Sequence, residues 1–348
     1  MFKKKICIYS LTLAMALAGM TGCGSSGSSS ESTAKTTAAT EKTSEGTSNS
    51  TSSEAFSVVC TIFPEYDWVK EILGDHADNV ELTYLLDNGV DLHSYQPTAD
   101  DIMKISSCDL FVYVGGESDE WAEDALADAQ NKDMKVISLM DVLGDSAKVE
   151  ELKEGMQGED EEEESEEEDE IEYDEHVWLS VKNAKVLCAE IEKNIEAIDP
   201  VNASDYKANL DSYTAKLSDL DNSFKTLVEG SSVKALVFAD RFPFRYFVDD
   251  YGLDYYAAFI GCSAETEASF ETIAFLADKV NKLDCKTIFT LENSSKDIAD
   301  TVISTSGKSV DIAELNSLQS VSKDDITGGA SYISLMQKNY DVLAGVLK

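Results

Sequence analysis

Three histidines occur in the chain, and two of them lie in short, unusually patterned segments. His93 belongs to residues 91–98, with the sequence D-L-H-S-Y-Q-P-T, and His176 belongs to residues 174–179, with the sequence D-E-H-V-W-L. Imidazole is the commonest protein ligand for transition metals, so each segment is a candidate ligand loop. A loop histidine with ordinary hydrogen-bond partners would explain either residue alone. The third histidine, His76, lies in a polar turn outside any motif, and we expect it to be solvated.

Two carboxylates follow apolar runs in the second half of the chain. Asp240 comes after the run 233–238, and Glu292 comes directly after the run 287–291. In open α/β sheets, ligands bind beyond the carboxyl ends of the strands, so these carboxylates and the two histidine loops could converge on one cleft. Two imidazoles with one or two carboxylates suit a divalent transition metal such as Zn²⁺, Mn²⁺ or Fe²⁺. No cysteine lies in these four loops, which disfavours copper(I) and iron–sulfur clusters.

Each carboxylate also has a purely structural interpretation. Asp240 and its neighbour Arg241 could form a surface ion pair or a turn, and Glu292 could belong to a helix cap. Residues 293–295, Asn-Ser-Ser, would cap that helix well without Glu292. Glu292 is therefore the stronger of the two candidates.

The elements that must position these residues follow an alternating pattern. Short apolar runs alternate with segments of helical spacing, which predicts βαβ units and parallel sheets. We expect an α/β fold of two βα lobes, residues 55–175 and 203–348, around a helical connector at 176–202. The expected strands are residues 57–63, 80–86, 110–114, 135–139, 233–238, 255–259 and 287–291, and further helices are expected at 203–228 and 332–347.

The N-terminus has the pattern of an export signal. A basic start is followed by an apolar run at residues 6–18 and by Gly22 and Cys23. This run is too short to span a membrane, and no later segment approaches that length. The ending resembles a bacterial lipobox, which implies a signal peptide at 1–22 and a lipid on Cys23; an ordinary secretory signal with a chance cysteine is the alternative. Residues up to 54, rich in Ser and Thr, would form a flexible tether.

Charge and cysteine usage exclude several classes. The net charge of -39 speaks against nucleic-acid binding, which requires a basic surface. Residues 159–175 contain 14 Asp or Glu among 17, and such a block is expected to form a solvated, acidic loop. The cysteines of the mature body form no CxxC pair, and their odd number argues against a full disulfide framework. A bridge between Cys262 and Cys285 is an open alternative that the sequence does not support.

The two histidine motifs resemble those of the metal-binding solute-binding proteins of bacterial ABC importers, the zinc/manganese group of ZnuA- and AdcA-like lipoproteins. Residues 91–98 are similar to the family's D-x-H-x-Y-E-P-T, and residues 174–179 to its D-P-H-V-W-L. Residues 115–121 resemble a strand-turn ending in G-x-x-x-E-x-W. The resemblance covers residues 56–347. It implies two lobes around a rigid helix, a metal cleft between them, and His93 and His176 as ligands.

The chain departs from the family at the third histidine. The family commonly has H-x-A-F-x-Y-F, whereas residues 241–247 have the sequence R-F-P-F-R-Y-F. Arg241 stands at the histidine position and, being permanently cationic, cannot coordinate a metal. Asp240 could serve instead, or Arg241 could support a ligand by pairing with a carboxylate. Glu292 matches the family's acidic ligand after its last main strand.

The resemblance implies capture of one divalent metal ion, zinc first and manganese or iron as alternatives, for delivery to an ABC-type permease. The expected partners are the permease subunits and, through Cys23, the extracytoplasmic face of the cell membrane; we expect a monomer. A metallohydrolase could use the same ligands, but no HExxH motif or nucleophile elbow is present. A surface adhesin would fit the anchor and tether equally well.

Overall fold

The computed structural model describes residues 55–158, 172–263 and 267–348. The proposed signal peptide, Cys23, the tether and most of the acidic run lie outside the described residues. Among the described helices, none combines the length and apolarity needed to span a membrane.

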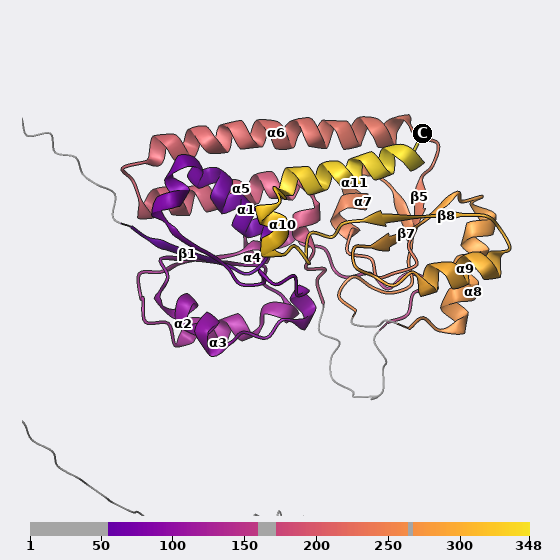
Figure 1. Ribbon diagram of the computed structural model, residues 1–348, viewed down its shortest axis with the longest axis horizontal. Coiled ribbons are helices and arrows are strands. Elements are labelled where there is room, and N and C mark those ends of the chain that lie inside the picture. The colour runs from indigo at the N-terminus through magenta and orange to yellow at the C-terminus, as the bar shows by residue number, and fades with distance from the viewer. Residues whose placement is uncertain (1–54, 159–171, 264–266) are drawn as a thin grey trace, which may run out of the picture. The chain divides into compact units, whose positions relative to one another are not determined.

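The N-terminal half is a four-stranded parallel sheet with the strand order β2-β1-β3-β4 (Figure 1). Two strands are shorter than expected because helices begin at their ends. Pro64 lies in the first turn of α1, where proline is favoured, and the Ser138 side chain accepts the N–H of Asp141 to cap α4. The elements are β1 (Ser57–Cys60), α1 (Phe63–Leu73), β2 (Glu81–Tyr84), α2 (Ala99–Ser107), β3 (Leu110–Tyr113), α3 (Trp121–Ala127), β4 (Lys135–Ser138) and α4 (Leu139–Leu143).

The C-terminal half contains two parallel strand pairs, β5-β6 and β7-β8. A parallel bridge between Phe238 and Phe289 links them. The expected strands are present, and so are the helices that the sequence pattern predicts at 244–251, 269–283 and 296–306; β8 and α10 are additions that this pattern did not indicate. The elements are β5 (Ala235–Val237), α7 (Arg245–Tyr251), β6 (Asp254–Tyr256), α8 (Phe270–Lys282), β7 (Thr287–Leu291), α9 (Asp297–Ser306), β8 (Asp311–Leu315) and α10 (Lys323–Thr327).

Three long helices join the halves: α5 (Val181–Ile198), α6 (Ala203–Gly230) and α11 (Tyr332–Val346). The expected connector, α5, packs against α1, α4 and α6. Helix α6 packs against both halves, because it contacts α1 toward one of its ends and α7 and α11 toward the other (Figure 1). Its apolar positions recur over its whole length, so one buried stripe can serve both neighbours.

Buried aromatic residues fix the chain just after His176. The Trp178 indole N–H donates to the carbonyl of Ser317 at 2.8 Å, and the Tyr332 hydroxyl donates to the carbonyl of Trp178 at 2.7 Å. Both aromatic side chains are fully buried. At the start of α11, the N–H of Tyr332 donates to the Asp67 carboxylate of α1 at 2.8 Å. The two bonds of Trp178 tie the start of the connector to the C-terminal half, and the bond of Asp67 ties α1 to α11.

Candidate metal centre

His93 lies in a single 3-10 turn, η2 (Leu92–Ser94), in the loop that follows β2. The Asp91 side chain accepts the backbone N–H of His93 at 3.1 Å and so caps this turn. On the ring, Nδ1 lies 2.7 Å from the Ser118 hydroxyl of η3 (Glu117–Asp119). A hydrogen bond at Nδ1 orients the imidazole and leaves Nε2 for another partner.

His176 is held in the same way from a different segment. It directly precedes η5 (Val177–Leu179) and is fully buried. Asp174 Oδ1 accepts the backbone N–H of His176 at 2.8 Å and lies 3.0 Å from its Nδ1. This carboxylate–histidine pair again leaves Nε2 as the outward nitrogen.

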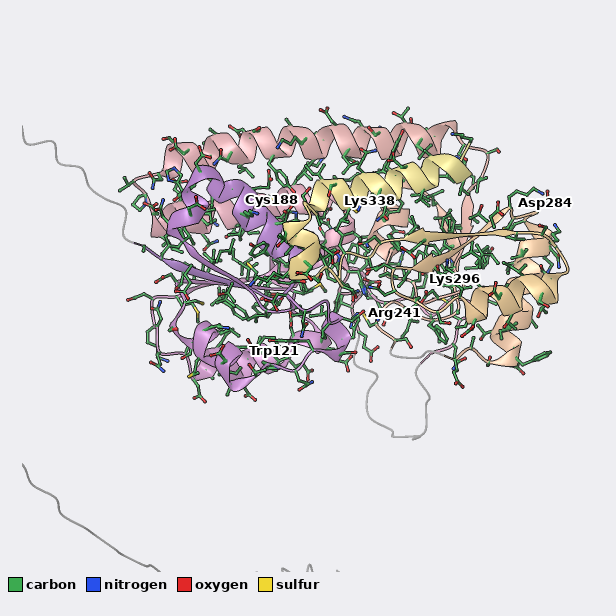
Figure 2. The ribbon with its side chains drawn as sticks, viewed as in Figure 1. Trp121, Cys188, Arg241, Asp284, Lys296 and Lys338 are labelled. Carbon is green, nitrogen blue, oxygen red and sulfur yellow. The ribbon has the colours of Figure 1, made fainter. Side chains whose placement is uncertain are left out.

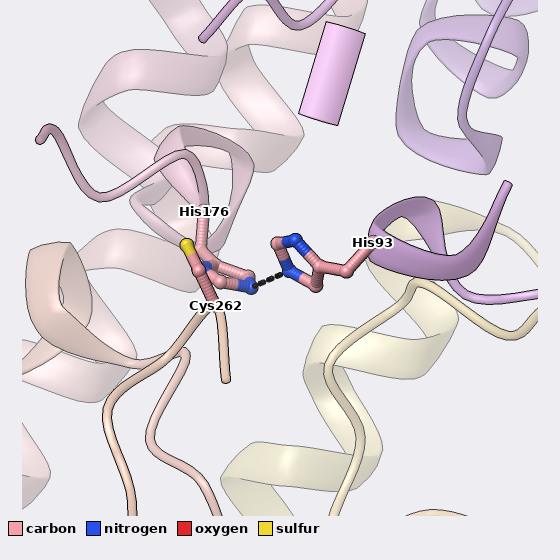
Figure 3. A group of neighbouring side chains, drawn as sticks. All are labelled: His93, His176 and Cys262. Atoms are coloured by element: carbon pink, nitrogen blue, oxygen red, sulfur yellow. Dashed lines mark hydrogen bonds between the residues drawn. The ribbon is translucent and has the colours of Figure 1, made fainter. Parts of the chain in front are cut away.

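The two Nε2 atoms face each other at 3.2 Å, and the ring centroids are 5.1 Å apart (Figure 3). Two nitrogen ligands of a tetrahedral zinc ion, each bound at its usual distance, lie roughly 3.3 Å apart. Burial, together with the neighbouring His176, lowers the pKa of His93 to about 3. The ring is therefore neutral near pH 7, which is the form that binds a metal.

Arg241 joins the two halves beside this pair. Its guanidinium is paired with the Asp91 carboxylate, and Figure 2 shows it in the middle of the molecule. Burial raises the pKa of Asp91, but the charge and hydrogen bond of Arg241, together with His93, outweigh burial and leave that pKa below its ordinary value. When the Gln319 side-chain amide is oriented with its nitrogen toward Asp91, that nitrogen donates to both carboxylate oxygens of Asp91. In the same orientation, the Gln319 side-chain oxygen lies 2.6 Å from His176 Nε2. Arg241 thus supports the His93 turn through Asp91.

A third candidate ligand comes from a loop that our sequence interpretation did not include. The Cys262 sulfur, the His93 nitrogen and the His176 nitrogen all lie within 4.8 Å of one another (Figure 3). Burial raises the pKa of the Cys262 thiol. Neither Cys262 nor Cys285 forms a disulfide. One signal was available, because Cys262 follows β6 and ligand loops follow the carboxyl ends of parallel strands.

The structure does not place the two predicted carboxylates in this group. Glu292 accepts the backbone N–H and the hydroxyl of Ser317, at 2.7 and 2.6 Å, and burial raises its pKa to about 7. Asp240 accepts the backbone N–H groups of Leu291 and Arg241, both at 2.9 Å. In the described part of the chain, neither belongs to a set of three ligand atoms within 4.8 Å of one another. Both carboxylates instead hold backbone at the ends of β5, β7 and β8.

The third histidine lies elsewhere, as the sequence predicts. His76 is in η1 (Gly74–Asn79), where its Nε2 lies 2.9 Å from the exposed carboxylate of Asp205. Its ring packs edge-on against Tyr206.

A cavity of about 1150 Å³ opens onto His93 and Cys262. Residues 115–121, which resemble the family's strand-turn, line part of its wall with Gly116, Glu117 and Trp121. A wall rich in carboxylates attracts cations and raises their local concentration. The acidic lining residues are Glu117, Glu120, Asp141, Asp145, Glu150, Glu172 and Glu175.

Comparison with known proteins gives one family. The family model of ZnuA, the zinc-uptake complex component A periplasmic, matches residues 58–346. The chain is 34% identical over 287 residues to the high-affinity zinc uptake system protein ZnuA of Bacillus subtilis, covering 82% of this chain and 86% of the relative. It is 32% identical to the zinc-binding lipoprotein AdcA of Streptococcus pneumoniae over 82% of this chain, but spans 55% of that relative.

A solved structure agrees with this result. The Zn(II)-bound ZnuA-like domain of Streptococcus pneumoniae AdcA superposes with a TM-score of 0.65 at 28% identity, over 84% of this chain and 99% of the domain. The predicted two-lobed α/β fold with parallel sheets is confirmed, and so is the resemblance inferred from the two histidine motifs. The chain belongs to the ZnuA family of zinc-uptake components.

Proposed function

We propose that this chain captures a zinc ion between its two halves and delivers it to the permease of an ABC importer. The observation that carries the proposal is the pair of facing Nε2 atoms of His93 and His176, 3.2 Å apart. Each ring is already fixed through its Nδ1, by Ser118 and Asp174. Imidazole nitrogen favours zinc over manganese, whose preferred ligands are oxygen atoms.

Glu292 is proposed as a further ligand of the ion, and Asp240 as a doubtful one. Glu292 is the stronger candidate because it directly follows β7 and matches the family's acidic ligand after the last main strand. To reach an ion it would exchange its Ser317 bonds for the metal. Asp240 is the weaker candidate because both of its oxygens hold backbone N–H groups.

The setting of this function is also a proposal. Residues 1–22 would be removed as a signal peptide, and Cys23 would anchor the mature chain, by a lipid and the tether up to residue 54, to the extracytoplasmic membrane face. The chain would bind the ion without transforming it and would act as a monomer.

Zinc stoichiometry tests the proposal directly. After the full chain is stripped with a chelator and dialysed against Zn²⁺, elemental analysis should find a single tightly held zinc ion per chain. Manganese and iron(II) at equal concentration should not displace it. A chain that takes up no zinc above the buffer level would contradict the proposed function.

Ser118→Ala should weaken zinc binding without unfolding the chain. It removes the hydroxyl that lies 2.7 Å from His93 Nδ1, and loss of such an orienting partner costs about 10–100-fold in metal affinity. Competition with a chromogenic chelator measures the Kd. Ser107→Ala is the matched control, because that exposed hydroxyl bonds only to carbonyls of its own helix. Equal affinity of the two variants would show that Ser118 does not orient the ring.

A further inference from the structure

We propose that Cys262 binds the captured ion through its sulfur, as a ligand contributed by the C-terminal half. This inference rests on the proposed function, since it names one more ligand of the same ion. With His93 and His176, the thiolate would form a two-nitrogen, one-sulfur set.

The position of the sulfur supports a ligand role. The Cys262 sulfur lies within 4.8 Å of the ligand nitrogens of both histidines. In a tetrahedral zinc site, the sulfur and nitrogen ligands lie roughly 3.6 Å apart. An inward movement of about an ångström, within reach of a side-chain rotation or a small closure of the loop, would complete the geometry.

The loop that carries Cys262 is built for this close approach. A Cβ atom on Gly261 would lie 2.9 Å from the carbonyl of Phe242 and 3.2 Å from the His176 ring, so only glycine fits there without a shift. On the other side, the backbone N–H of Cys262 donates to Glu150 at 3.0 Å. The absence of a side chain at Gly261 therefore lets the loop approach His176, and the hydrogen bond from Cys262 to Glu150 helps to hold it there.

Other side chains of the C-terminal half near the histidines are already engaged. Arg241 cannot coordinate a metal and is paired with Asp91. Asp240 holds two backbone N–H groups, and Glu292 holds Ser317 through both oxygens. The Cys262 thiol also has a partner, the Glu150 carboxylate, but it forms no disulfide and it lines the cavity that opens onto His93.

Metal binding converts the Cys262 thiol to a bound thiolate. The thiol releases its proton to solvent as the metal–sulfur bond forms, so one proton leaves for each such bond and no electron is transferred. A thiolate ligand favours zinc, and also cadmium, over manganese and iron(II), whose sites are rich in oxygen. Cys262 would then be a specificity-determining residue of the site.

Cobalt(II) substitution of the full chain makes the sulfur visible. A Co²⁺–thiolate bond gives a sulfur-to-metal charge-transfer band in the near ultraviolet, whereas Co²⁺ bound only by nitrogen and oxygen shows the visible ligand-field bands alone. The parent chain and Cys285→Ser, the matched control thiol, should show the charge-transfer band. Cys262→Ser should lose it, with zinc affinity falling about 100-fold and manganese affinity changing less. Cys262→His should recover zinc affinity without the band.

A second measurement needs no substitution. Zinc should protect Cys262 of the parent chain from iodoacetamide, as read by peptide mass spectrometry, and should leave the modification of Cys285 unchanged. A parent that binds Co²⁺ without the band, or whose Cys262 is alkylated equally with and without zinc, would overturn the thiolate ligand and leave the proposed function intact. A parent that binds neither zinc nor cobalt would instead overturn the proposed function.

Discussion

The double replacement His93→Ala/His176→Ala is expected to weaken zinc binding by about four orders of magnitude. Zinc sites with four protein ligands bind with about 10–16 kcal/mol, which is roughly 3 kcal/mol, or about 100-fold in Kd, for each ligand. The two side chains removed here supply the facing Nε2 atoms. Calorimetric titration, or chelator competition where binding is too tight, measures the change.

His76→Ala provides the matched control for this double variant. It also removes an imidazole, but one bonded to Asp205 away from the pair, so its zinc affinity should equal that of the parent. Circular dichroism of each variant checks that the fold is retained. A double variant whose Kd stays within about tenfold of the parent would mean that the zinc ion binds elsewhere.

Asp67→Asn is expected to stabilise the metal-free chain above neutral pH and to lose that effect in mild acid. Burial raises the pKa of Asp67 from 3.8 to about 7. The folded state therefore holds a proton that the unfolded state releases, so the stabilising contribution is complete below about pH 4 and is lost as the pH rises through about 7. Asparagine keeps an oxygen to accept the Tyr332 N–H and cannot ionise.

Urea unfolding at several pH values measures this difference. At about pH 8 the variant should exceed the parent by about 2–4 kcal/mol, since each pKa unit corresponds to about 1.36 kcal/mol. At about pH 4 the two should agree. Comparing variant with parent cancels the opposite contribution of His93, whose lowered pKa opposes folding in acid. Asp75→Asn, at an exposed position, should change stability little at either pH; an equal effect there would contradict the assignment to Asp67.

The features of the fold that depend on local sequence pattern could be predicted from the sequence. Apolar runs with turn signals predicted the parallel strands, because strand and helix periods are properties of short segments. The ends of those strands were less predictable, as at Phe63 and Leu139, where apolar side chains begin buried helices. The strand β8 was missed because only Leu315 of its five residues is buried, and the charged residues Asp311 and Glu314 interrupt its apolar run.

In the candidate site, too, the residues in local motifs could be predicted, and the contacts made by tertiary folding could not. The histidine motifs were found because each is a local pattern, with Asp91 or Asp174 two residues before the histidine and accepting its backbone N–H. Cys262 was not found, because it lies 86 positions after His176 in the sequence and comes near it only when the chain folds. This close approach also depends on Gly261. The partners of Glu292 were equally hidden, since Ser317 follows the strand that was missed.

The spacing of the two imidazoles bears on how the ion would leave. Because the Nε2 atoms are already close to ligand spacing, little ordering remains to be done when an ion arrives. A preorganised site is expected to release its ion slowly, because high affinity is expressed mainly as a low dissociation rate. The two rings are carried by separate turns, η2 and η5. Release of the ion would then require η2 and η5 to move apart, a conformational change that an acceptor could induce and that would withdraw both imidazoles from the ion together.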